Sequence, residues 1–118
     1  MEDMSLETEA LRAFLADCGG EDVVALDLRE TIGWTDYFVI ATAGSEARLD
    51  GLERRVGEFC RERELSVRRP DRGRAALAAR GAQNEWRVID LGSIIVHLMT
   101  GRARSFYDLE RLHSKAPR

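Results

Sequence analysis

The sequence predicts one domain of the α/β (α+β) class, a mixed β-sheet flanked by helices, and three observations support this. The chain has 118 residues, which suits one domain. Apolar residues recur with helix or strand spacing in the order α-β-β-α-β-β-α. Strands that follow one another directly imply antiparallel pairs, whereas a strand–helix–strand step implies a crossover. Since there are no internal repeats, we expect residues 1–118 to form a single domain.

The N-terminal part predicts a helix and then a strand. Residues 5–17 place apolar side chains on one helical face, and Ser5 is suited to cap the first turn. Gly19 and Gly20 are expected to end this helix, because glycine readily adopts the left-handed conformation found there. The short apolar run 23–26 predicts a strand that is buried on both faces.

The next part predicts a strand over residues 36–42 and a helix that begins after Ser45. Apolar residues recur at helical spacing from Leu49 to Cys60, so one face of this helix should be buried. Asp50 and Arg54 are four residues apart and are expected to form an ion pair on the exposed side.

The last third predicts a long loop, a β-hairpin and a closing helix. Residues 68–85 are interrupted by proline and glycine and carry many arginines, which is typical of a loop. Residues 86–90 and 94–99 predict two strands, and the turn 91–93 between them suits a tight hairpin. Residues 103–112 predict the last helix.

The composition is that of an ordinary globular protein, with 44% hydrophobic and 33% charged residues. No apolar run approaches the roughly 20 residues that a membrane span requires. The acidic first residues lack the basic and apolar regions of a secretory signal, and only two cysteines occur. We therefore expect a cytoplasmic protein in a reducing compartment, without contact to a membrane.

Charge is distributed unevenly along the chain. Residues 1–30 hold nine acidic residues and two arginines, whereas residues 68–80 hold five arginines and one acid. Such asymmetry indicates a charged partner without identifying it. The arginine-rich loop 68–85 is compatible with an rRNA contact or simply with a solvated loop.

The chemistry of an enzyme is largely missing from the sequence. No zinc-ligand spacing and no specific phosphate-binding motif occurs, so we expect no metal and no cofactor. The fragment Thr42-Ala43-Gly44-Ser45 lies between a strand and a helix, where nucleotidyltransferases hold a phosphate. Those enzymes also need paired carboxylates for Mg²⁺, and Asp90 stands alone. Ser45 is more simply an N-cap, and we expect no catalytic residues.

Three side chains are candidates for contact with a partner. Trp86 and Tyr107 are large aromatic residues flanked by charge, which is common at interfaces but equally common in cores. His97 lies within an apolar strand, where a hydrogen-bonded structural histidine is more frequent than an interface residue.

Three fragments together resemble the iojap family of ribosomal silencing factors. Residues 22–28 and 35–42 are similar to the opening strands of that family, residues 86–99 to its central hairpin, and residues 106–112 to its closing helix. The resemblance implies a nucleotidyltransferase-like fold without the metal carboxylates. It also implies that the protein binds the large ribosomal subunit at ribosomal protein fourteen and blocks association with the small subunit. Translation would thereby be repressed in starvation or stationary phase.

The residues that match the family motif supply the predicted partner-binding set, which is Trp86, His97, Tyr107, Leu109 and Glu110. Asp90 and Gly92 also match and are expected to shape the hairpin turn. The sequence departs from the family at Ser93, where aspartate is usual, at His113, where an aromatic residue is common, and in the more basic loop 68–85.

Other functions stay open alongside this one. A minimal nucleotidyltransferase-like enzyme would bind nucleotide and magnesium, and an adaptor for large-subunit assembly would bind the same subunit for a different purpose. Edge strands in a small sheet also leave room for a homodimer.

Overall fold

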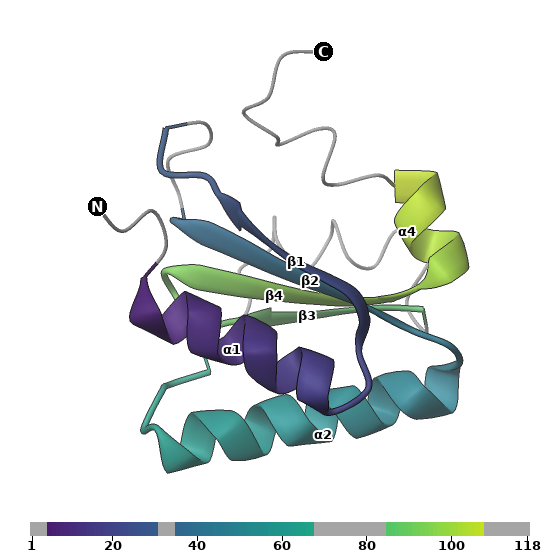
Figure 1. Ribbon diagram of the computed structural model, residues 1–118, viewed down its shortest axis with the longest axis horizontal. Helices are drawn as coiled ribbons and strands as arrows, with labels where there is room; N and C mark the ends of the chain where they lie inside the picture. Colours follow the sequence, from purple (N-terminus) through teal and green to yellow (C-terminus); the bar gives the residue numbers. More distant parts are fainter. Residues whose placement is uncertain (1–4, 31–34, 68–84, 108–118) are drawn as a thin grey trace.

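The computed structural model describes residues 5–30, 35–67 and 85–107, and these form a four-stranded mixed sheet with helices (Figure 1). The elements are α1 (Leu6–Asp17), β1 (Glu21–Asp27), β2 (Tyr37–Ala43), α2 (Glu46–Glu62), β3 (Trp86–Asp90), β4 (Ile94–Thr100) and α4 (Gly101–Tyr107). This order confirms the predicted fold class. None of the helices in these ranges is long and apolar enough to cross a membrane.

The strand order β1-β2-β4-β3 follows from two hairpins joined side by side. β1 pairs with β2 and β3 pairs with β4, both antiparallel, as expected for strands without a helix between them. β2 and β4 run parallel in the centre of the sheet, and α2 lies in the long connection that parallel strands require.

The two faces of the sheet are covered differently. α1 and α2 lie together on one face (Figure 1), where Leu11, Val56 and Val96 belong to one buried cluster. The opposite face holds a second cluster that includes Phe38 and Ile95, with a contribution from α4. Every residue of β2 is buried, because successive side chains of this central strand point into one cluster or the other.

Both long helices begin and end with the local structure that their sequences specify. Ser5 and Ser45 accept hydrogen bonds from the third backbone N–H after them, at 3.1 and 3.2 Å, which confirms both predicted caps. α1 ends in a Schellman motif at Gly19, whose φ is +97°. α2 ends in the same motif, but Glu64 takes the left-handed position with φ +58°.

Three of the sequence predictions need correction. β1 was expected to be buried on both faces, but it is an edge strand whose residues are half-buried or exposed. The acidic group of Asp50 accepts from Arg87 of β3 at 2.7 Å, instead of pairing with Arg54 of its own helix. The last helix begins at Gly101 rather than at residue 103, and residues 108–112 lie outside the described residues.

Candidate partner-binding site at the last helix

The start of α4 is fixed by contacts between Thr100, Glu85 and Arg102. The Thr100 side-chain oxygen accepts from Ala103 N–H at 3.3 Å and lies 2.7 Å from Oε1 of Glu85. The Thr100 backbone N–H donates to the Glu85 carbonyl at 2.9 Å. Arg102 donates from Nε to Oε1 of Glu85 at 3.1 Å and from Nη2 to Oε2. These contacts join the end of β4 and the residue before β3 to the first turn of α4.

The same contacts set the ionisation of Glu85. Hydrogen bonds from Arg102, and then from Thr100, hold the pKa of the Glu85 carboxyl below its ordinary value. The carboxylate in turn raises the pKa of Arg102. Because the Arg102 side chain is 82% exposed, solvent screens this ion pair, and it orients α4 more than it stabilises the whole domain.

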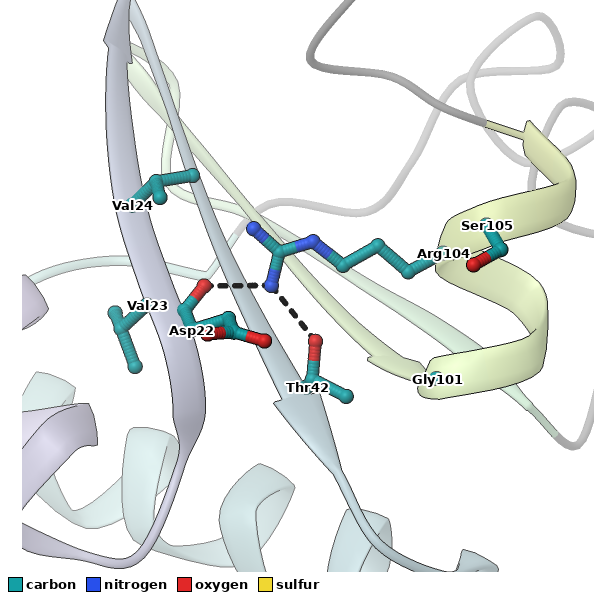
Figure 2. Close-up of a pocket in the computed structure, with 7 residues that line it drawn as sticks. All are labelled: Asp22, Val23, Val24, Thr42, Gly101, Arg104 and Ser105. Carbon is teal, nitrogen blue, oxygen red and sulfur yellow. Dashed lines mark hydrogen bonds between the residues drawn. The ribbon is translucent and has the colours of Figure 1, made fainter.

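Arg104 connects the middle of α4 to the edge of the sheet, as Figure 2 shows. Its Nη1 donates to the backbone carbonyl of Asp22 at 2.6 Å and to the hydroxyl of Thr42 at 2.7 Å. Asp22 has φ +49° and lies in a β-bulge of β1, where the register with β2 shifts. The bulge turns a carbonyl of the edge strand toward the helix, so that one arginine can bind both strands.

A cavity of about 790 Å³ lies between α4, β1 and β2 (Figure 2). It is lined by Asp22, Val23, Val24, Thr42, Gly101, Arg104 and Ser105. The lining combines a carboxylate, a guanidinium group, two hydroxyl groups and two valines. No sequence pattern points to Arg104, Thr42 or Glu85, because their partners are distant in the chain.

Trp86 and His97 form a buried pair on the second face of the sheet. The indole Nε1–H donates to Nδ1 of His97 at 3.0 Å, and the side chains are only 2% and 1% exposed. Because Nδ1 accepts, the imidazole is neutral with its proton on Nε2. Phe38 packs edge-on against His97 with ring centroids 4.4 Å apart. A role of Trp86 and His97 in partner binding therefore stays a prediction. Because both side chains are buried, such a role would have to be indirect, through the surface residues that pack over them.

The other predicted binding residues lie at or beyond the end of α4. Tyr107 is the last residue of that helix, and only its backbone belongs to the described structure. Leu109 and Glu110 lie outside the described residues, as does the loop 68–85 except for Glu85. Their roles stay predictions.

The hairpin turn has the geometry that the sequence predicted. Gly92 has φ +92°, and its N–H donates to Oδ1 of Asp90 at 2.8 Å. The hydroxyl of Thr35 donates to the Gly92 carbonyl at 3.1 Å, which ties the turn to the residue before Asp36 and β2. Asp90 and Gly92 thus shape the hairpin.

Among the residues that the structure describes, no group of three His, Cys, Asp or Glu side chains could hold a metal ion. The hydroxyl of Ser45 is engaged as a helix cap by Arg48 N–H, which accounts for the Gly44-Ser45 fragment without a phosphate.

Comparison with known sequences gives one consistent result. The family model described as "Ribosomal silencing factor during starvation" matches residues 2–118. A ribosomal silencing factor of Treponema pallidum is 39% identical over 103 residues, which cover 87% of this chain and 86% of the relative. One from Bacillus subtilis is 29% identical over 101 residues, covering 86% and 79%. The chloroplastic protein Iojap of Zea mays is 27% identical over 95 residues, covering 80% of this chain and 38% of that protein.

Solved structures share the fold. A crystal structure of a Chromobacterium violaceum protein superposes with a TM-score of 0.77 at 23% identity, covering 100% of this chain and 92% of that one. A Bacillus halodurans protein superposes with a TM-score of 0.71 at 24% identity, covering 97% and 100%.

Proposed function

The chain belongs to the family of ribosomal silencing factors, and we propose that it binds the large ribosomal subunit through ribosomal protein fourteen and thereby blocks joining of the small subunit. The match of the family model along residues 2–118 is the observation that carries this proposal. Binding would repress translation in the cytoplasm under starvation or in stationary phase. The family is named for silencing and not for a reaction, which supports a non-enzymatic role.

We place the docking surface at α4 and the adjoining start of β1. Tyr107 lies at the end of α4, and Leu109 and Glu110 follow it directly in the sequence. The helix is fixed to the sheet by Arg104 and by the Glu85 contacts, so its direction is set before a partner arrives. A preformed surface binds with less loss of conformational entropy than a flexible one.

Exposed acidic side chains at the edge of the sheet beside α4 support binding to a basic partner. Glu21 and Asp22 are exposed at the start of β1, and Glu46 is exposed at the start of α2. Acidic groups of this kind speed encounter with a basic ribosomal protein, an effect that weakens as salt rises. The mechanism needs only occupation of a surface, since a bound protein excludes the small subunit by its volume.

Light scattering of purified ribosomal subunits tests the proposal. The protein is added to large subunits before or after small subunits, in a buffer with enough magnesium for association. Suppression that depends on adding the protein first is the expected result. Normal association with folded protein in excess would contradict silencing, and co-sedimentation with large subunits alone would then favour a role in their assembly.

The melting temperature in the presence of magnesium and nucleotide tests the enzymatic alternative. A minimal nucleotidyltransferase would be stabilised by magnesium and nucleotide, because a ligand that binds only the folded state raises the melting temperature. We expect no such rise. Size measurement in solution would similarly decide whether free edge strands produce a homodimer.

A further inference from the structure

A second cavity, on the side of the sheet that α1 and α2 cover, has a basic lining. Its volume is about 210 Å³, and it lies between the turn after α1 and the N-terminal half of α2. Besides Cys18, Gly19 and Ala43, it is lined by Arg48, Gly51, Leu52, Arg54 and Arg55. Three arginines thus meet at one small cavity, and no carboxylate is among the lining residues.

The charges of α2 are separated by the geometry of the helix. Asp50 and Glu53 both accept hydrogen bonds from Arg87 of β3, at 2.7 and 2.9 Å, so this one guanidinium offsets one of their two negative charges. Neither carboxylate lines the cavity. Within the described part of the chain, Arg48 and Arg54 make no ion pair. Neither of these two guanidinium groups is therefore neutralised by a direct ion pair within the described residues.

Two neighbouring groups moderate that charge without removing it. Interaction with the Cys18 side chain, and then the ion pair with Oε1 of Glu58 at 3.1 Å, raise the pKa of Arg55. Glu21 is a second carboxylate near Arg48, since Cδ of Arg48 and Oε2 of Glu21 lie 3.7 and 4.0 Å from where a Cβ on Gly44 would stand. Neither carboxylate lines the cavity, and Arg48 and Arg54 remain available to an incoming anion.

Gly51 leaves the α2 side of the cavity without a side chain at its centre. Glycine inside a helix costs about 1 kcal/mol relative to alanine. A Cβ at Gly51 would meet only Nη2 of Arg54 at 4.0 Å, so packing does not require glycine there. The absence of a side chain at Gly51 leaves space next to the Arg54 guanidinium.

We infer that the cavity formed by Arg48, Gly51, Arg54 and Arg55 binds a phosphate or pyrophosphate group. Guanidinium groups hold phosphate oxygens with paired, charge-assisted hydrogen bonds. The volume lies below the roughly 300 Å³ at which pockets begin to hold a drug-sized molecule, so it accepts the phosphate part of a ligand and not a whole nucleotide. The phosphate belongs either to a free phosphorylated compound or to an RNA backbone. This inference does not depend on the silencing role.

Calorimetric titration of the full chain with sodium pyrophosphate tests the site. Arg48→Gln and Arg54→Gln should each weaken binding about tenfold, the loss expected for one charged hydrogen bond. Arg61→Gln is the matched control, because Arg61 is exposed on the same helix but does not line the cavity. Gly51→Leu should also weaken binding, by filling the cavity without changing any charge. Equal loss in Arg61→Gln, or no binding to pyrophosphate or RNA, would overturn the inference.

Two further readouts locate and identify the ligand. Cys18 lines the cavity whereas Cys60 is buried, so bound pyrophosphate should slow alkylation of Cys18 by iodoacetamide. Fluorescence anisotropy with a short RNA that has hydroxyl ends separates the two sources. RNA binding that pyrophosphate displaces assigns the site to a nucleic-acid backbone, and pyrophosphate binding without RNA binding assigns it to a free compound. Alkylation that pyrophosphate leaves unchanged would place any binding elsewhere and contradict the inference.

Discussion

The Trp86 indole donates a hydrogen bond to Nδ1 of His97 inside the domain. Two residues of types that are common at interfaces therefore bind each other in the core. The antiparallel register explains the contact. Val88 lies opposite His97 and Trp86 opposite Met99, which makes Trp86 and His97 diagonal neighbours on one face of the sheet. The pair sets the orientation of a neutral imidazole within the second cluster.

Replacing Trp86 with phenylalanine tests this pair. The ring is kept but the donor is lost, and leaving a buried acceptor without its donor costs about 1–3 kcal/mol. Urea unfolding should show this loss of stability, and Trp86→Ala should lose more, about 3–5 kcal/mol, through the cavity it creates. Unchanged stability in Trp86→Phe would mean that the hydrogen bond is not formed in solution.

Tyr107→Ala tests the docking surface directly. We expect large-subunit binding to weaken about tenfold or more, as for an aromatic anchor at an interface, while the melting temperature changes little. Co-sedimentation across a range of protein concentrations measures the binding to large subunits, and calorimetry measures the melting temperature. A large drop in melting temperature would instead assign Tyr107 to the core.

Removing the contact between Arg104 and the sheet should loosen α4. Thr42→Val deletes one acceptor with little change of shape, and Arg104→Gln deletes the cation. Both should speed amide hydrogen exchange in α4, with the larger effect for Arg104→Gln, and both should weaken subunit binding. Faster exchange with unaltered subunit binding would show that α4 is not part of the docking surface.

Glu85 makes folding stability depend on pH in a defined direction. Its carboxyl has a pKa below the ordinary value of 4.5 in the folded state, because Arg102 and Thr100 bind the charged form. The stabilisation is therefore present above that value and is lost as pH falls through the lower, folded pKa. Glu85→Gln should be less stable than the parent at neutral pH and should approach it in acid. Denaturant unfolding at both pH values checks this, and a difference that persists in acid would contradict it.

The two helix ends provide a matched pair of backbone variants. Glu64 adopts φ +58°, which is unfavourable for a residue with a Cβ, so Glu64→Gly should stabilise the protein by about 0.5–1 kcal/mol. Gly19 has φ +97° with nothing within 4 Å of an added Cβ, so Gly19→Ala should destabilise it by about 1 kcal/mol through the backbone alone. Thermal unfolding measures both, and shifts of the same sign would be inconsistent with this explanation.

Local features of the fold could be predicted from the sequence because their causes are local. The serine caps, the end of α1 at Gly19 and the hairpin turn at Gly92 each depend on a few neighbouring residues. The two antiparallel pairs followed from the absence of a helix between their strands, whereas the choice of β4 as the parallel partner of β2 was not predicted. The half-exposure of β1 could not be predicted from its apolar run, because burial depends on a strand's place in the sheet.

The candidate site was harder to predict, since its contacts cross the chain. Arg104 and the Asp22 carbonyl are 82 residues apart, and the bulge that presents this carbonyl leaves no simple sequence pattern. Trp86 and His97 were predicted to contact a partner, and the structure buries both side chains. Residues of these types are common to cores and interfaces, so their type alone could not decide the placement. The hairpin turn at Gly92 fixes the pairing of the two strands, and this pairing places Trp86 and His97 on the same face of the sheet.

The central pairing of β2 with β4 has a consequence for how the chain folds. Each hairpin joins strands that are close in sequence, whereas β2 and β4 come from separate halves of the chain. Contacts between distant residues form slowly, because the intervening chain must be ordered before they contribute. We therefore expect the meeting of the two hairpins to be the slow step of folding. Until it occurs, the unpaired backbone N–H and C=O groups along β2 and β4 are open to other chains.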